Sequence, residues 1–243
     1  MLFANISGEK VEATPRSTAT CPLCDKAVIS KCGNINVWHW AHQKVENCDN
    51  WYEHETEWHK SWKLAFGVDN CEIVINKDNI KHIADVLTKD GIVIELQNSP
   101  ILDSTIIERE RFYGESMIWI INGLDFNRNF SYQPPYFTLG EQWYWRNEVE
   151  LTEDGYVDLN TGELVTKPER GYTFFWNWPR RSWSYAERKI YIDFGGVDLF
   201  MITKGMGSKQ GNFKPINKEN FLKEHQGNTE LLETLIIKDI IDP

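Results

Sequence analysis

The chain lacks an apolar run long enough to cross a membrane. A transmembrane helix needs roughly 20 mostly apolar residues, whereas the longest apolar runs here are of the size of residues 117–121. The N-terminus also lacks a basic start followed by a long apolar stretch, so no signal peptide is visible. We therefore expect a cytoplasmic protein without a membrane partner.

The chain also has no positive net charge, and its number of cysteines is odd. The formal charge of −10 counts against a nucleic-acid partner. The charge is uneven, however, because residues 165–218 contain ten Lys and Arg against four acidic residues. The five cysteines include a Cys-x-x-Cys motif, which in a reducing compartment indicates metal or redox chemistry more than a disulfide framework.

The composition is that of a folded protein with one or two domains. An apolar content of 41% with 11 tryptophans among 243 residues argues against disorder. The spacing of apolar and polar residues predicts a helix within 52–66, strands at 71–75, 83–87 and 92–97, a helix at 106–113 and a buried strand at 116–121. This order predicts an α/β fold around a mixed sheet. Farther along, we expect a loop at 125–135, strands at 189–194 and 199–203, and a helix from Leu222.

A cluster of Cys and His in the first 50 residues predicts a structural zinc site. Cys21 and Cys24 flank a Pro-Leu turn that lets two thiolates meet one tetrahedral ion. The next candidates occur in the tract HWAHQKVENC, from which we favour His42 and Cys48. His39 stays open as a substitute ligand or as a residue behind the ligands. Buried free cysteines with hydrogen-bonded histidines are the alternative, and four protein ligands would leave no position for catalytic water.

Acidic residues on the predicted hairpin suggest a second metal site. Glu95 and Gln97 are two residues apart in a strand and point to the same face. Asp85 can reach that face across the Lys-Asp-Gly turn, and Glu55 can add a carboxylate from the preceding helix. Such carboxylates suit one or two Mg²⁺ ions in phosphodiester hydrolysis. His59 and Lys63 follow Glu55 at helical spacing and would contact phosphate.

An ordinary half-exposed hairpin would also carry alternating acidic residues. The tract IVIELQ around Glu95 is strongly apolar, and a carboxylate there is costly to bury without a partner. This cost favours the metal site over the ordinary hairpin.

The second half of the chain interleaves aromatic and basic residues in the tract YTFFWNWPRRSWSY. Such a tract suits stacking on bases and attraction to phosphates. The alternative is that its aromatic residues are core and its arginines lie on a solvated turn. The tract KGMGSKQG lacks the full spacing of a phosphate-binding loop and predicts a flexible loop. The candidate DNA contacts are Arg109, Arg180, Arg181 and Trp183.

The ordered motifs resemble the competence protein CoiA-like family, whose nuclease domain belongs to the PD-(D/E)XK, or restriction-endonuclease-like, group. The resemblance covers roughly residues 18–125. His82 departs from it, because the family usually has Arg before Ala-Asp. The matching motifs are Cys21-Pro-Leu-Cys24, His39-Trp40-Ala41-His42, Cys48, Glu55-Thr56 with His59 and Lys63, Ala84-Asp85-Val86, Glu95-Leu96-Gln97, Ser99-Pro100-Ile101, and Glu108-Arg109 with Tyr113.

The resemblance implies a fold, a domain order and an activity. The fold would be a restriction-endonuclease-like mixed-sheet core (residues 51–128) between an N-terminal zinc-binding module (1–50) and an aromatic-rich C-terminal region (129–243). The activity would be Mg²⁺- or Mn²⁺-dependent endo- or exonucleolytic cleavage of DNA during transformation and recombination. Single-stranded or branched DNA and recombination proteins would be the partners.

The resemblance also implies that Gln occupies the place of the usual Lys in this family; the amide of Gln97 can accept from water and donate to a phosphate oxygen. The alternatives are a non-cleaving DNA-binding or recombination-partner module with a vestigial nuclease site, and a zinc-stapled scaffold without DNA contact.

Overall fold

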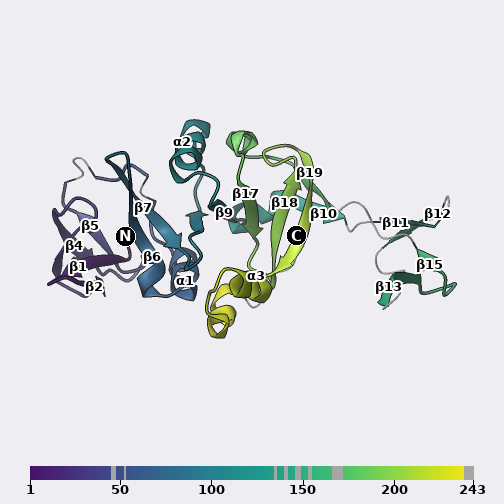
Figure 1. Ribbon diagram of the computed structural model, residues 1–243, viewed down its shortest axis with the longest axis horizontal. Coiled ribbons are helices and arrows are strands. Elements are labelled where there is room, and N and C mark those ends of the chain that lie inside the picture. The colour runs from purple at the N-terminus through teal and green to yellow at the C-terminus, as the bar shows by residue number, and fades with distance from the viewer. Residues whose placement is uncertain are drawn as a thin grey trace.

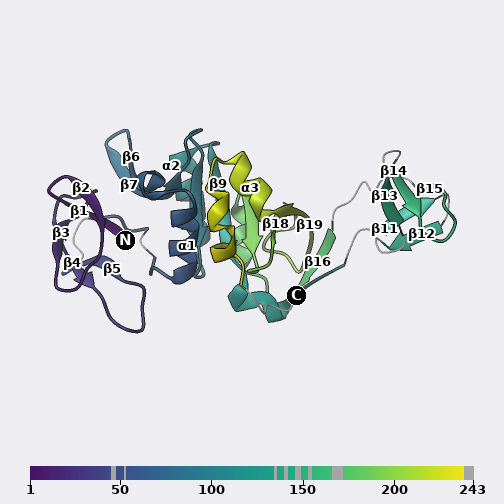
Figure 2. The same ribbon diagram turned by 90° about the horizontal axis from the view of Figure 1, so that it is seen from below.

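The computed structural model of the protein describes residues 1–44, 48–51, 53–133, 136–139, 142–145, 149–152, 155–165 and 172–237. Figures 1 and 2 show an elongated molecule in which the N-terminal strands lie at one end and the small sheets of residues 136–165 lie at the other. Within the described residues, no helix is long and apolar enough to cross a membrane.

The N-terminal strands form a five-stranded sheet, which we call the N-terminal module. The strand order is β2-β1-β3-β4-β5, and every neighbouring pair is antiparallel. Its small core is built around Trp40, Val28 and Cys21, which are fully buried. The strands are β1 (Phe3–Ile6), β2 (Glu9–Glu12), β3 (Thr18–Thr20), β4 (Ala27–Lys31) and β5 (His39–His42).

A nine-stranded mixed sheet forms the body of the molecule. Its strand order is β10-β16-β19-β18-β17-β9-β8-β7-β6, and β9 pairs in parallel with both β8 and β17. The boundary expected at residue 128 therefore falls between strands of one sheet. The strands are β6 (Cys71–Lys77), β7 (Ile80–Leu87), β8 (Val93–Gln97), β9 (Met117–Asn122), β10 (Phe130–Gln133), β16 (Tyr172–Trp176), β17 (Lys189–Asp193), β18 (Asp198–Lys204) and β19 (Gln210–Asn217).

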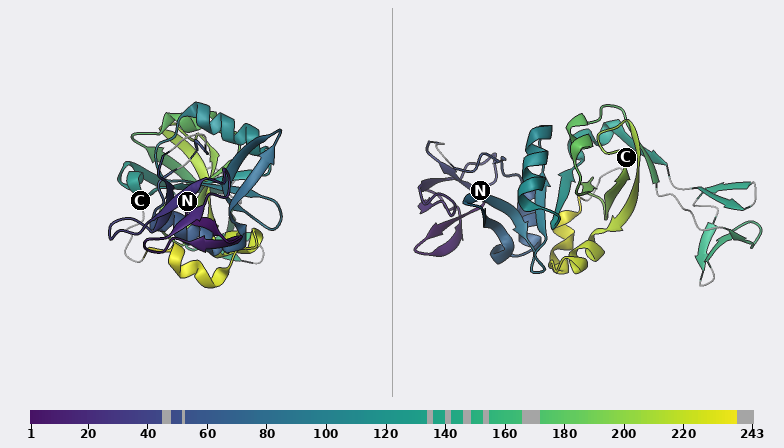
Figure 3. Two further views of the ribbon diagram at one scale, coloured as in Figure 1. Left: turned by 90° about the vertical axis from the view of Figure 1, so that its left-hand side faces the viewer. Right: turned by 45° about the horizontal axis from the view of Figure 1, so that its top comes forward.

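Helices cover both faces of this sheet, which explains the continuous apolar run in β9. Trp119 and Ile121 pack with α2 (Asp103–Tyr113) in one core cluster. Ile118 and Ile120 pack with α1 (Glu57–Ala65) and α3 (Lys218–Glu224) in another. Figure 3 shows α2 and α3 on opposite sides of the sheet.

The first helix starts at a capped residue. The Thr56 hydroxyl accepts a hydrogen bond from the His59 amide and so satisfies one of the free N–H groups of the first turn. Trp62 and Ala65 face the core, which leaves His59 and Lys63 on the side toward the N-terminal module. The helix expected within 52–66 is therefore present, over the shorter range of α1.

The mixed α/β architecture predicted from the sequence is confirmed, with three differences in detail. Residues expected to form a loop at 125–135 contain a 3₁₀ turn (Leu124–Asn129) and the strand β10. Strand β19 was not predicted, because its Gly, Pro and Asn suppress the strand pattern. Short strands also lie beyond β10: β11 (Tyr136–Leu139), β12 (Gln142–Trp145), β13 (Val149–Thr152), β14 (Gly155–Asp158) and β15 (Leu164–Val165).

Candidate active site and metal centre

Four ligand atoms of the N-terminal module converge on one point. One ligand atom from each of Cys21, Cys24, His42 and Cys48 lies within 4.8 Å of the others. Cys24 Sγ is 3.2 Å from His42 Nε2, and Cys21 Sγ is 3.8 Å from Cys48 Sγ. A Cys₃His set at this separation could hold a structural metal such as zinc.

The chemistry of the cluster also fits a cation. Burial raises the pKa of Cys21, and it raises the pKa of Cys48 to about 12, with nearby Cys21 adding to the effect. Burial lowers the pKa of His42, so its ring is held neutral as a metal ligand requires. A divalent ion would supply the positive charge that adjacent thiolates need.

His39 lies outside this ligand set. Its Nδ1 is 2.8 Å from the carbonyl oxygen of Val37, and its side chain lines a cavity instead. Of the two further cysteines, Cys71 is buried, and its thiol donates to the carbonyl oxygen of Lys63 at 2.7 Å.

A row of carboxylates crosses three neighbouring strands of the large sheet. The pairs Cys71–Val86 and Ile73–Ala84 place Glu72 opposite Asp85 across β6 and β7. On the other side of β7, the Asp85 amide donates to Glu95 Oε1 at 3.4 Å, and the Leu96 amide donates to Asp85 Oδ2 at 3.0 Å. Like charges opposite each other destabilise a sheet, so this row needs cations.

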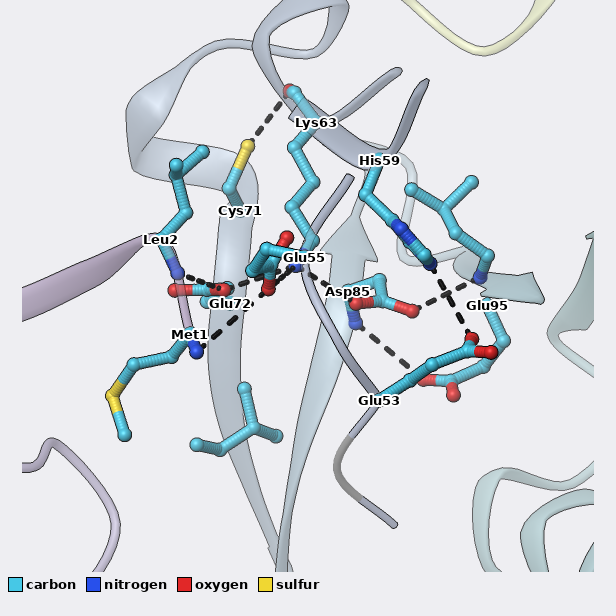
Figure 4. A network of polar contacts seen from close by, with 12 residues as sticks. Met1, Leu2, Glu53, Glu55, His59, Lys63, Cys71, Glu72, Asp85 and Glu95 are labelled. Carbon is cyan, nitrogen blue, oxygen red and sulfur yellow. Dashed lines mark hydrogen bonds and ion pairs between the residues drawn. The ribbon is translucent and has the colours of Figure 1, made fainter. Parts of the chain in front are cut away.

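Lys63 supplies one of these cations (Figure 4). Its Nζ lies 2.7 Å from Glu55 Oε1, 3.0 Å from Glu72 Oε1 and 3.1 Å from Asp85 Oδ1. The side chain is only 2% exposed. Burial alone would lower the pKa of Lys63, but the three carboxylates raise it well above its ordinary value, so the ammonium stays charged.

Arg109 supplies the second cation. Its Nη1 donates to Glu95 Oε2 at 2.7 Å, and its Nη2 donates to the Trp51 carbonyl oxygen at 2.5 Å. Even so, burial raises the pKa of Glu95 to about 8; Arg109 opposes this rise and Asp85 adds to it. Glu95 is therefore a carboxyl group whose ionised form would gain from a further cation.

Glu53 fixes the orientation of Gln97. Gln97 Nε2 donates to Glu53 Oε1 at 3.2 Å and to the Ser99 carbonyl oxygen at 3.0 Å. Both partners only accept, so the nitrogen of the amide, and not its oxygen, must face them. Gln97 Oε1 is buried without a hydrogen-bond partner within the described residues. The amide can thus still accept a hydrogen bond, but it has no N–H left for a phosphate oxygen.

Glu53 itself is held by several donors. It accepts from the Asn98 amide at 3.1 Å and from the Ser99 amide, and His59 Nε2 lies 3.4 Å from its Oε2. Burial opposes ionisation, yet these donors lower the pKa of Glu53 to about 2. The imidazole ring of His59 is also held at its other nitrogen, because Thr56 Oγ1 lies 2.9 Å from His59 Nδ1.

One cavity of about 480 Å³ joins the acidic row to the N-terminal module. The large sheet, α1 and the segment before α1 contribute Glu55, His59, Lys63, Asp85 and Glu95 to the lining of this cavity. The structure therefore brings together five of the six predicted catalytic residues around one space, and Gln97 lies beside it through Glu53. The N-terminal module contributes Met1, Lys31, Asn36, His39, Trp40, Ala41, His42 and Cys48.

The predicted DNA contacts separate in the structure. Trp183 is 1% exposed and packs edge-on against Trp119, so its ring cannot stack on a base and this prediction is corrected. Arg109 is committed to Glu95, as described above. Arg181 is exposed, whereas Arg180 is half-buried with its guanidinium over Phe126. The exposed aromatic residues of this tract are Trp178 and Tyr185, which are 76% and 56% exposed.

Two residues of the site, Glu53 and Glu72, were missed by sequence reasoning. Glu72 is buried, has a φ of 46°, and accepts from the amides of Leu2 and Phe3 at 2.7 and 2.8 Å. Although burial opposes ionisation, Lys63 and these amides lower its pKa to about 2. A carboxylate inside the apolar tract CEIVI was the available signal, because such a group needs a buried partner.

Comparison with protein families matches residues 4–50 to the N-terminal domain of the competence protein CoiA. The chain is therefore similar to CoiA over its N-terminal module. The matched range includes Cys21, Cys24, His42 and Cys48, the residues of the converging ligand set. Comparison with curated proteins and with solved structures gave no significant match.

Proposed function

We propose that this protein is a CoiA-like, metal-dependent DNA nuclease with a restriction-endonuclease-like core, acting in DNA processing during transformation and recombination. The observation that carries the proposal is the acidic cavity. Carboxylates from α1's leading segment, β7 and β8 line one space beside a histidine, and a buried glutamine lies next to it. Metal-assisted phosphodiester hydrolysis needs this combination of groups.

The acidic row fits a divalent cation. Asp85 and Glu95 lie opposite each other, and burial holds Glu95 largely protonated without more positive charge. Glu55 Oε2 is buried without a hydrogen-bond partner within the described residues, so it too has an unused acceptor. Asp85, Glu95 and Glu55 would hold Mg²⁺ or Mn²⁺, which when bound would lower the pKa of a water molecule and offset phosphate charge.

The neighbouring side chains have separate tasks in this proposal. Gln97 Oε1 accepts a hydrogen bond from water and orients it, because the amide N–H groups are already bound. His59 contacts the phosphate from the α1 side of the cavity. Lys63 holds the carboxylates of Glu55 and Asp85 in place, since its ammonium is buried among them. Arg180, Arg181 and Trp178 would contact the DNA strand farther away.

Cleavage of labelled single-stranded and branched DNA in Mg²⁺ or Mn²⁺ tests the proposal. Asp85→Asn and Glu95→Gln should each lower the rate at least about 100-fold. Asp103→Asn is the matched control, because Asp103 is exposed at the start of α2 outside the cavity. Circular dichroism and zinc content verify that each variant is folded. Cleavage at the wild-type rate by both active-site variants would refute the nuclease.

One observation favours a second function, that of a DNA-binding or recombination-partner module that does not cleave. The Lys63 ammonium already neutralises Glu55, Glu72 and Asp85. Within the described residues, the set that could hold a metal ion by the distances between its ligand atoms is the Cys₃His cluster. Tight DNA binding without cleavage in either metal would support this function over the nuclease.

A further inference from the structure

The cavity between the N-terminal module and the large sheet has two walls of opposite character. The wall formed by the large sheet and α1 carries the carboxylates of Glu55, Asp85 and Glu95. The wall formed by the module carries Lys31, Asn36 and His39. A structural metal ion would need none of these three side chains, since the Cys₃His ligand set is complete without them.

Strand pairing places Lys31 and His39 side by side. They are the register partners next to the loop that joins β4 to β5, so their side chains project from the same face of the module's sheet. The next residue of β5, Trp40, is fully buried in the module's core. Because side chains alternate along a strand, this burial directs His39 to the opposite face.

The polar atoms of this pair remain available. Val37 O only accepts, so His39 Nδ1 carries a hydrogen; Nε2 is the ring atom left for a ligand, and it donates to an anion in the doubly protonated form of the ring. Lys31 is exposed, and no ion pair is recorded for it within the described residues. The other cations of the lining, the Met1 ammonium, Lys63 and Arg109, are paired with carboxylates.

Charge favours an anionic ligand on the module's wall. Lys31, which has no carboxylate partner in the part of the chain that the structure describes, lines the cavity together with His39 and Asn36, and such a set of groups binds a phosphate oxygen. A DNA strand that enters the cavity would then lie between this wall and the acidic row.

We propose that Lys31 and His39 of the N-terminal module form a phosphate-binding subsite for the DNA strand that enters the acidic cavity. The CoiA N-terminal domain is then part of the substrate-binding surface, in addition to any metal that it holds. This inference rests on the proposed function for the identity of the ligand. It assigns to the β4–β5 pair a role that a purely structural metal module would not have.

Binding of a fluorescent single-stranded oligonucleotide to the zinc-loaded full chain tests the subsite. Anisotropy is measured over a series of salt concentrations with Ca²⁺ in place of Mg²⁺, and a gel verifies that the DNA stays intact. Each lost phosphate contact should lower the affinity about fivefold near physiological salt and reduce the salt slope by about 0.7 for single-stranded DNA. We expect this change for Lys31→Gln and a weakening for His39→Gln.

Two controls separate the subsite from folding and from general charge. Lys31→Arg keeps the charge and should retain wild-type affinity. Lys44→Gln removes an exposed cation of the same module outside the cavity lining and should change the affinity less than twofold. Zinc content should stay at the wild-type value in all four variants, because none of these residues belongs to the ligand set.

The outcomes distinguish this inference from the proposed nuclease. Unchanged affinity and salt slope in Lys31→Gln would overturn the subsite even if the protein cleaves DNA. Loss of zinc together with loss of binding would assign the effect to folding of the module and would also overturn it. Weaker binding in Lys31→Gln, with no cleavage by wild type in Mg²⁺ or Mn²⁺, would support the subsite and refute the nuclease.

Discussion

Replacing Glu53 by Gln should destabilise the protein at neutral pH and should weaken the pH dependence of its free energy of unfolding in the acid range. The Glu53 carboxylate accepts from the Asn98 and Ser99 amides and from Gln97, and His59 Nε2 lies 3.4 Å away. Its pKa is lowered from 4.5 to about 2 in the folded state. At about 1.4 kcal/mol for each pKa unit, the ionised form contributes on the order of 3 kcal/mol.

The direction of the pH effect follows from the sign of the shift. A carboxyl group with a lowered pKa in the folded state contributes its full stability above about pH 4.5, where it is ionised in both states. Below that pH, the unfolded chain takes up the proton first, and the contribution falls by about 1.4 kcal/mol per pH unit until about pH 2. Glu53→Gln lacks this titrating group and loses the contribution at every pH.

Urea unfolding of both proteins at pH 7 and pH 3.5 measures the effect. The difference between wild type and Glu53→Gln should be on the order of 3 kcal/mol at pH 7 and about 1 kcal/mol smaller at pH 3.5. Metal loss at acid pH affects both proteins and cancels. Glu108→Gln, at an exposed position on α2, should match wild type within about 0.5 kcal/mol. A difference at pH 7 as small as that of this control would refute the reasoning.

Two further predictions concern the metal centre and the buried ion pair between β17 and α3. Cys48→Ser should lower the zinc content and reduce the hydrogen-exchange protection of the Ile83 amide. This amide donates at 2.8 Å to Asp49, the residue after the ligand Cys48. Protection equal to wild type in zinc-depleted protein would contradict the link between the metal centre and this hydrogen bond. Asp193→Asn should destabilise the fold by about 3–5 kcal/mol in urea unfolding, because it leaves the buried Lys218 ammonium, 2.8 Å away, without its carboxylate. Adding Lys218→Met should recover part of this loss. If it recovers none, the loss does not come from the unpaired ammonium.

The helices and strands that the sequence predicted well are those with a strong local signal. The apolar run of β9, the Lys-Asp-Gly turn before β8 and the helical spacing in α1 each depend on neighbours within a few residues. Strand β19 has no such signal, because Gly and Pro are depleted in strands; it is defined by its pairing with β18 and, over residues 210–213, with β16. The tract around Trp183 also misled, because the same aromatic spacing suits a core and a DNA surface.

The candidate site likewise contains features that the sequence predicted and features that it did not. The ligand set Cys21, Cys24, His42 and Cys48 could be chosen from spacing, since a tetrahedral ion restricts how far apart its ligands can be in a short module. The sequence also determined which carboxylates lie on the β7–β8 hairpin, because register and alternation fix the face of Asp85 and Glu95.

Tertiary structure alone decided what those carboxylates meet. Glu53 and Glu72 join the site from segments that have no local reason to approach Gln97 and Lys63. The burial that raises the pKa of Glu95 to about 8 exists only when α2 brings Arg109 against β8. The amide of Gln97 is left as an acceptor because the folded chain surrounds its nitrogen with oxygen atoms. Residue types and spacing thus determined the candidate ligands, whereas long-range packing decided their charge, orientation and partners.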